Sequence, residues 1–196
     1  MIEVLLLGGT GAMGTFLVDI LAKSKINCVV TSRSKKNSYN YVTYICGNAK
    51  DDTFLFPLLE SRHWSSIIDF MSYSTDEFAN RFQKLLKCTD QYVYLSSSRV
   101  YANSETPLKE SSPRLLDSCS DKEYLSTDEY ALSKARQENL LLSCCLKNWT
   151  IIRPYITFSD ARLQLSCLEK EYWLKRVLDN KPIVFSKDLA NKTTTF

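Results

Sequence analysis

The sequence predicts an α/β fold built on a doubly wound, Rossmann-like parallel sheet with helices on both faces. Short runs rich in β-branched residues alternate with longer runs of helical periodicity along the 196 residues. The first run, residues 2–7, is apolar except for Glu3, as expected for a strand buried on both faces. A glycine-rich turn follows this run directly, which is the usual start of such a sheet.

The later elements follow from the same alternation. Strands are expected at 27–31, 42–46, 66–71, 91–96, 148–153 and 182–185. Helices are expected at 15–22, 51–62, 76–87, 127–146 and 166–178. Asp51 or Asp52 is the expected cap of the second helix, and Thr127 or Asp128 that of the fourth. Residues 102–126 are rich in Ser, Pro and acidic side chains, and they are expected to form one long loop, either functional or disordered.

The composition is that of an ordinary globular chain. The net charge of +3 is small, and basic residues do not alternate with aromatic ones, so nucleic-acid binding is not expected. Apolar runs are too short for a membrane span, and the first residues lack the basic leader of a signal peptide. Seven cysteines without a CxxC pair, together with a single histidine, predict reduced thiols, a cytoplasmic location and no metal site.

The turn at residues 8–14, GGTGAMG, has glycines spaced by three between a strand and a helix. The first glycine permits a tight turn, the second lets the backbone approach a pyrophosphate, and the third lets the helix pack closely. The free N–H groups of the helix N-terminus then face the phosphates. The alternative is a glycine-rich turn without a ligand. The candidate cofactor-binding residues here are Gly8, Thr10, Gly11, Ala12, Met13 and Gly14.

The charges after the second expected strand bear on the choice of cofactor. Enzymes that use NAD usually place an acidic residue there, against the adenosine ribose. This chain instead has Arg33 and Ser34, and no acidic residue stands between Ile20 and Asp51. Because arginine can pair with a 2′-phosphate, NADP is favoured and NAD is the alternative. The neighbouring Lys35 and Lys36 can equally be a solvated loop.

Two further patterns suggest proton-transfer chemistry. Tyr130 and Lys134, in YALSK, lie four residues apart and would share one helix face. An ammonium group beside a phenol lowers the phenol pKa, so such a tyrosine can exchange a proton with a hydroxyl during hydride transfer. Three serines, 96–98, end the strand before this helix, where a hydroxyl would face the ligand crevice of the sheet. The alternative is that they satisfy backbone groups, which is the interpretation preferred for Ser96.

These motifs together resemble the extended short-chain dehydrogenase/reductase family, in its branch of nucleotide-sugar epimerases and dehydratases. GGTGAMG is similar to its cofactor motif, YLSSSRVYANSETPLKESSP to its catalytic serine stretch, and YALSK to its YxxxK motif, in matching order from residue 1 to about 186. The resemblance implies Ser97 as the catalytic serine, with Ser98 as the fallback, Tyr130 as the acid/base, and Lys134 as the residue that assists it. It also implies that the cofactor is lined by Asn48, Phe70, Met71, Tyr130, Lys134 and Pro154.

The chain also departs from the family pattern. Ser98 and Arg99 stand where dehydratases that remove water have an Asp-Glu pair, which disfavours a 4,6-dehydratase. Ile156 and residues 158–160 replace a segment that the family uses for substrate phosphate. Similar proteins are considerably longer, so residues 1–160 are expected to be the cofactor domain and 161–196 the start of a substrate-binding region that lacks its later part.

The sequence therefore predicts an NAD(P)-dependent epimerase or reductase that acts on a nucleotide sugar by hydride transfer, with a tyrosine as acid/base. The alternative is a truncated NAD(P)-binding protein without turnover, either a remnant or a redox-sensing binder. The helices at 76–87 and 127–146 resemble the four-helix face through which such proteins form homodimers.

Overall fold

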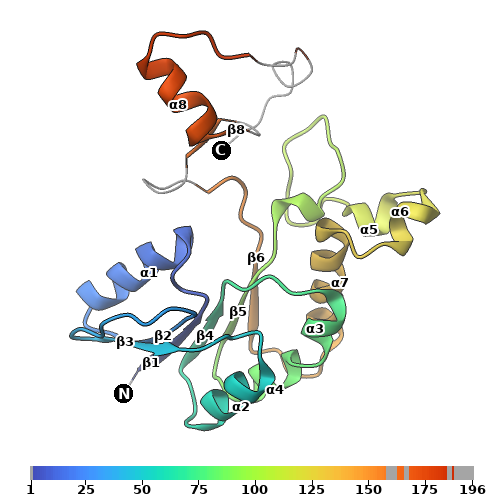
Figure 1. Ribbon diagram of the computed structural model, residues 1–196. Coiled ribbons are helices and arrows are strands. Elements are labelled where there is room, and N and C mark those ends of the chain that lie inside the picture. The colour runs from blue at the N-terminus through green and yellow to red at the C-terminus, as the bar shows by residue number, and fades with distance from the viewer. Residues whose placement is uncertain (1, 158–162, 166–167, 185–186, 188–196) are drawn as a thin grey trace. The chain divides into compact units, whose positions relative to one another are not determined.

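The computed structural model describes residues 2–157, 163–165, 168–184 and 187, and it forms two compact units, Met1–Pro154 and Tyr155–Phe196. The first unit is built on a six-stranded parallel sheet (Figure 1). Its strands are β1 (Glu3–Leu7), β2 (Asn27–Ser32), β3 (Val42–Cys46), β4 (Ser66–Asp69), β5 (Tyr92–Leu95) and β6 (Trp149–Ile152). Their order, β3-β2-β1-β4-β5-β6, reverses between β1 and β4. This arrangement confirms the predicted Rossmann-like sheet.

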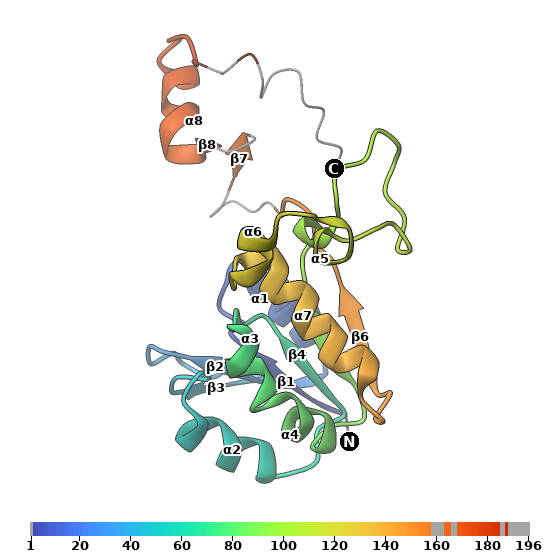
Figure 2. The same ribbon diagram turned by 90° about the vertical axis from the view of Figure 1, so that its right-hand side faces the viewer.

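Helices of this first unit cover both faces of the sheet, with α1 on one face and the other sheet-packing helices opposite it (Figure 2). The helices of this unit that pack on the sheet are α1 (Ala12–Lys23), α2 (Asp52–Glu60), α3 (Thr75–Ala79), α4 (Phe82–Lys87) and α7 (Tyr130–Ser143). Alternate residues of β1 serve the two faces: Val4 and Leu6 pack in the core beneath α1, whereas Leu5 and Leu7 lie in the larger core on the other side. The continuous apolar run of β1 is therefore explained by burial on both faces.

The expected helix at 76–87 is wrong as a single element, because it is divided into α3 and α4. Arg81 lies at the break, where its φ of −122° departs from helical geometry. Its side chain is buried, pairs with Asp52 at 3.1 Å and stacks over the ring of Tyr73. These tertiary contacts explain why helical periodicity alone did not reveal the break.

The expected boundaries between residues 102 and 146 also need correction. The expected loop contains two short helices, α5 (Leu115–Ser118) and α6 (Lys122–Ser126), and α7 starts later than expected and ends at Ser143. Thr127 closes α6 with its hydroxyl on the carbonyl of Tyr124, and Asp128 accepts bonds from Thr75 on α3. Glu129 caps α7 instead. At the earlier helix, Asp51 is the cap of α2, as one of the two expected alternatives.

The second unit contains a short antiparallel pair, β7 (Gln164–Leu165) and β8 (Leu168–Glu169), followed by α8 (Lys170–Leu178). The helix expected at 166–178 therefore begins later, and its first two residues lie outside the described part of the chain. Residues 182–184 are not a strand, and Phe185 is also outside the described residues. No helix within the described ranges is long and apolar enough to cross a membrane.

Candidate active site

The candidate residues of the first unit gather at one edge of the sheet, where the parallel strands end. Leu7 pairs with Asp69, and the amide of Phe70 bonds the carbonyl of Leu7 at 2.9 Å, so the glycine turn lies beside Phe70 and Met71. Farther along the edge, the amide of Ser98 bonds the carbonyl of Pro154 at 2.9 Å. This edge, at the point where the strand order reverses, is where ligands of such sheets bind.

The glycine turn has the geometry that each glycine was expected to provide. Gly8 has a φ of 71°, which favours a residue without a Cβ, and its amide is held by the hydroxyl of Thr31 at 3.0 Å. A Cβ on Gly14 would lie 2.6 Å from the backbone of Gly9, so only glycine lets α1 approach the turn this closely. A Cβ on Gly11 would instead meet only the carbonyl oxygen of Gly8, at 3.8 Å.

This open space at Gly11 fits a dinucleotide phosphate. Gly11 is the cap of α1, and within the described residues the first amides of that helix receive no side-chain cap bond. The first turn of α1 also contains no acidic residue, so the positive end of the helix dipole is not neutralised there. Backbone N–H groups at an uncapped helix start suit a pyrophosphate. Thr10, Ala12 and Met13 lie in the same turn or at the start of the helix.

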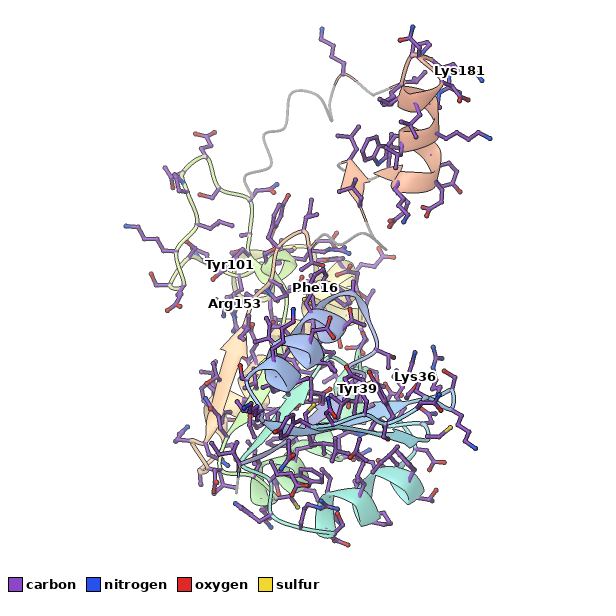
Figure 3. All side chains as sticks on the ribbon, turned by 90° about the vertical axis from the view of Figure 1, so that its left-hand side faces the viewer. Phe16, Lys36, Tyr39, Tyr101, Arg153 and Lys181 are labelled. Carbon is purple, nitrogen blue, oxygen red and sulfur yellow. The ribbon has the colours of Figure 1, made fainter. Side chains whose placement is uncertain are left out.

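The residues expected near the adenosine ribose follow β2 and β3. Arg33 and Ser34 come directly after β2 and are exposed, and Lys36, labelled in Figure 3, lies in the same segment. The hydroxyl of Ser34 is 3.5 Å from that of Ser32. Asn48 follows β3, is exposed, and accepts a bond from the amide of Lys50 at 3.1 Å. The strand register therefore places a basic, exposed segment at the same edge as the glycine turn.

Ser97, Tyr130 and Lys134 lie on two elements that pack together, the short 3₁₀ helix η1 (Ser98–Val100) and α7. Ser97 is buried and caps η1 by accepting a bond from the amide of Arg99 at 3.2 Å, which leaves its own hydroxyl hydrogen able to donate. The ammonium of Lys134 lies 6.0 Å from the ring centroid of Tyr130, whose side chain is half exposed. The structure thus brings a hydroxyl, a phenol and an ammonium to one place.

Lys134 is almost fully buried, and its Nζ donates to the carbonyl of Leu95 at 2.8 Å. Burial lowers the pKa of Lys134 to about 8, although Asp69 and Glu138 act in the opposite direction. A lysine whose pKa lies this close to neutrality, at the ligand edge of a sheet, is typical of functional sites.

Sequence reasoning missed Asp69, the last residue of β4. Its carboxylate is buried, accepts bonds from the hydroxyl of Tyr92 at 2.7 Å and from the amide of Met71 at 2.9 Å, and lies near the hydroxyl of Tyr73. Burial raises the pKa of Asp69 above its ordinary range, while these hydrogen bonds and Lys134 oppose the shift. The sequence signal that could have revealed Asp69 is its position among the apolar residues of the strand expected at 66–71.

Sequence reasoning also missed Glu138, one turn beyond Lys134 on α7. Its buried carboxylate accepts bonds from Ser96 at 2.6 Å, from two nitrogens of Arg153 at 2.8 Å, and from Arg114 at 3.1 Å. Arg153 also donates to the hydroxyl of Tyr101, and Figure 3 labels this pair. The hydroxyl of Ser96 therefore bonds the side chain of Glu138, and the expectation that it bonds backbone groups at the strand end is wrong.

Burial alone would raise the pKa of Glu138, but the bonds from Arg153, Ser96 and Arg114 outweigh it and hold this pKa below its ordinary value. Glu138 is thus a buried charge that joins α7 to the strands carrying the serines and Pro154. Elsewhere in the described residues, no group of histidine, cysteine or acidic side chains is placed to hold a metal ion.

The fold is a Rossmann-like domain, and solved structures that include epimerases and a dehydratase share it. Among solved structures, the enzyme WbmH of Bordetella bronchiseptica, crystallised with NAD+, matches with a TM-score of 0.66 and 15% identity over 92% of this chain and 64% of that one. The UDP-Glc/GlcNAc 4-epimerase of Campylobacter jejuni matches with a TM-score of 0.60 and 17% identity, over 78% and 53% of the two chains. A dTDP-glucose 4,6-dehydratase of Bacillus anthracis in complex with NAD has a TM-score of 0.58 and 16% identity, over 78% of this chain and 54% of that one.

A curated relative is also found, the chloroplast stem-loop binding protein of 41 kDa b of Arabidopsis thaliana. It is 24% identical, and the match covers 92% of this chain but 48% of the relative, so the chain spans about half of that protein's length. No known protein-family profile matches the chain. At these identities the solved structures show a shared fold.

Proposed function

We propose that the chain is the cofactor-binding and catalytic part of an NAD(P)-dependent epimerase or reductase acting on a nucleotide sugar. The observation that carries this proposal is the placement of Ser97, Tyr130 and the buried Lys134 at the sheet edge that also holds the glycine turn. The proposed cofactor domain comprises residues 1–160, and residues 161–196 begin the proposed substrate-binding region. Residues 1, 158–162, 166–167, 185–186 and 188–196 of these ranges lie outside the described structure.

The proposed roles follow from the contacts. Bound NAD(P) would supply the hydride acceptor and donor for the sugar carbon. Tyr130 removes the proton of the reacting hydroxyl and later returns it, and Ser97 donates a hydrogen bond to the same oxygen. Lys134 supplies positive charge beside Tyr130 from a buried position, where such a charge acts more strongly than in water. Ser98 and Arg99 offer no carboxylic acid after Ser97, so removal of water from the sugar is disfavoured.

NADP is the proposed cofactor, although two of the solved neighbours named above, WbmH and the dTDP-glucose 4,6-dehydratase, were crystallised with NAD. Arg33 is exposed at the end of β2, where a charge-assisted bond to a 2′-phosphate would contribute about 1.5–3 kcal/mol. Fluorescence titration of wild type should therefore show tighter binding of NADPH than of NADH, and Arg33→Ala should remove the difference. Lys87→Ala, at the end of α4, is the matched control. Equal affinities of wild type for the two cofactors would contradict the NADP proposal.

A second candidate function is cofactor binding without turnover, as in a remnant or a redox-sensing binder. It is favoured by the curated relative, which is named for binding a stem-loop and not for a reaction. The exposed basic residues after β2 could serve a nucleic-acid hairpin as well as a cofactor phosphate. Competition between NADPH and a labelled RNA hairpin on the purified chain would reveal such a shared site.

The test of the main proposal is turnover. The purified chain would be incubated with NAD(P) and a panel of UDP-, GDP- and dTDP-sugars, and the absorbance of reduced cofactor and the sugar products would be followed. Conversion that is lost in Tyr130→Phe, with cofactor affinity retained, supports catalysis. Cofactor binding without conversion of any sugar favours the second candidate instead.

A homodimer through α3, α4 and α7 is also proposed. A hollow of about 560 Å³ lies between α4 and the end of α7, with mainly apolar walls. Its lining residues are Ala79, Phe82, Gln83, Lys87, Leu140, Ser143, Cys144, Cys145 and Leu146. Analytical ultracentrifugation of the purified chain tests this assembly. The cytoplasmic location stays a prediction.

A further inference from the structure

Arg99 holds an exposed positive charge directly beside the proposed acid/base. Its Cζ lies 5.4 Å from the ring centroid of Tyr130, and its own amide bonds the hydroxyl of Ser97. The side chain of Arg99 is 64% exposed and Tyr130 is 40% exposed, so both can be reached from solvent. A ligand group near the tyrosine hydroxyl would therefore come close to this guanidinium.

The guanidinium of Arg99 is held in place by Glu129, and this contact leaves N–H donors for a ligand. One nitrogen of Arg99 donates to Glu129 at 2.9 Å. The other carboxylate oxygen of Glu129 already accepts from the amide of Ala131 at 2.7 Å and from the hydroxyl of Tyr124 at 3.0 Å, so its negative charge is shared. An arginine has five N–H donors in a planar fork, and one bond to Glu129 leaves donors for a second carboxylate.

The other arginines that contact α7 serve the fold instead. Arg114 and Arg153 are bonded to the buried Glu138, and their side chains are 13% and 19% exposed. Arg136 is 26% exposed and donates to Asp128 and to two backbone carbonyls. Arg99 differs from all three in its exposure and in facing the ring of Tyr130. The Arg99–Glu129 pair is exposed to solvent, and such surface pairs contribute little to stability.

We propose that Arg99 selects a sugar substrate that carries a carboxylate next to the carbon whose hydroxyl Tyr130 and Ser97 address, that is, a nucleotide-linked uronic acid. A carboxylate can accept two parallel bonds from the guanidinium fork, and a neutral hydroxymethyl group cannot. The N-terminus of α7, a helix of 14 residues, adds a favourable dipole on the same side. This inference rests on the proposed function, because it assumes that a sugar binds beside Tyr130.

The experiment compares two ligands that differ only at this group. UDP-glucuronate and UDP-glucose are titrated by calorimetry into the wild-type chain saturated with NADP+, and into Arg99→Gln, Arg99→Lys and Arg62→Gln. Arg62 is the matched control, because it also pairs with an acid, Glu3, and stacks over a ring, that of Trp64, but it lies at the opposite ends of the strands.

Wild type and Arg62→Gln should bind UDP-glucuronate at least about tenfold more tightly than UDP-glucose, as expected for a charge-assisted contact. Arg99→Gln should bring the two affinities together by weakening UDP-glucuronate alone, and Arg99→Lys, which keeps the charge without the fork, should keep part of the preference. The same ratio in Arg99→Gln as in wild type, no preference in wild type, or binding of neither sugar overturns the inference. Cofactor affinity, measured separately by fluorescence, tests the proposed function and should not differ between Arg99→Gln and wild type.

Discussion

Lys134 shows at the scale of one residue how a buried charge destabilises the fold. Its ammonium is buried and donates a hydrogen bond to the carbonyl of Leu95. Because folding lowers its pKa from the ordinary 10.5 to about 8, the charged form is less favourable inside the protein than in water. This difference corresponds to about 3 kcal/mol of destabilisation at neutral pH.

Replacing Lys134 by methionine should therefore stabilise the protein at pH 7, by about 1–3 kcal/mol. The sign also fixes a pH dependence. Between pH 8 and 10.5 the unfolded chain binds more protons at this residue than the folded chain does, so this contribution makes wild type more stable as the pH rises. The advantage of Lys134→Met should shrink through that window. Urea unfolding of both proteins at pH 7, 8, 9 and 10 checks this, and an advantage that stays constant with pH would contradict it.

Residues of the site differ in how far the sequence could predict them. Gly8, Gly11 and Gly14 were found because a turn between strand and helix requires their spacing. Asp69 and Glu138 were missed because their importance lies in partners far away in the chain, such as Tyr92 for Asp69 and Arg153 for Glu138. Local patterns do not contain such pairings.

At the scale of the element, two glycines of the turn into α1 have different expected roles: Gly14 allows close packing, and Gly11 is proposed to leave space for a phosphate. Gly14→Ala places a methyl group 2.6 Å from the backbone of Gly9, so α1 must move, and we expect a loss of about 2 kcal/mol or more in the free energy of unfolding. Gly11→Ala meets only the carbonyl of Gly8 at 3.8 Å, and its φ of −79° suits alanine. Its stability should change little.

The same two variants should differ in how they affect NADPH affinity relative to stability. The methyl group of Gly11→Ala would fill the open space proposed for the pyrophosphate, so NADPH affinity should fall at least about tenfold without a loss of stability. Thermal unfolding and NADPH fluorescence on both variants measure this. Unchanged affinity in Gly11→Ala would remove the phosphate interpretation of the turn.

Glu138 connects helix α7 to the sheet through its bonds to Ser96 and Arg153. Glu138→Gln removes a buried charge that pairs with Arg153 and Arg114, and it leaves Arg153 without a carboxylate, so we expect a loss of about 3–5 kcal/mol. Since the carboxyl pKa is held below 4.5, this stabilisation is present above that pH and is lost as the pH falls further.

The control for that variant is Glu60→Gln, which breaks the exposed pair with Lys84 and should cost less than about 1 kcal/mol. Urea unfolding at pH 7 and again near pH 3 compares the two variants. Equal losses at pH 7, or a loss in Glu138→Gln that does not diminish in acid, would show that the network is not what joins α7 to the strands.

Element boundaries were predicted well where the local chain decides them and poorly where distant contacts do. β3 was expected and found at Val42–Cys46, because its flanking segments are polar. The start of α7 was misplaced because Asp128, a good local cap, is engaged by Thr75 of another helix. The division between α3 and α4 depends on Arg81 in the same way.

At the scale of the whole molecule, the alternation of strands and helices was enough to predict the sheet, and the sheet then brings distant motifs together. Parallel strands end at one edge, so residues following β1, β2, β4, β5 and β6 lie along the same edge although they are far apart in sequence. The contacts between those segments could not be predicted from the sequence. Examples are the burial of Lys134 and the stacking of Arg99 on Tyr130.

The first compact unit, Met1–Pro154, contains the glycine turn, Arg33, the serines, α7 and Pro154. A protein consisting of residues 1–154 should therefore fold cooperatively and bind NADPH within about twofold of the full chain, a difference below about 0.5 kcal/mol.

A matched fragment of residues 1–147 lacks β6, which pairs with β5, and Arg153, which pairs with Glu138. That fragment should fail to fold, since a buried carboxylate loses its main partner and a central strand becomes an open edge. Circular dichroism on heating and NADPH fluorescence decide both points. A folded 1–147 fragment would show that β6 and Arg153 are dispensable, and weak NADPH binding by a well-folded 1–154 fragment would show that the cofactor site needs residues of the second unit.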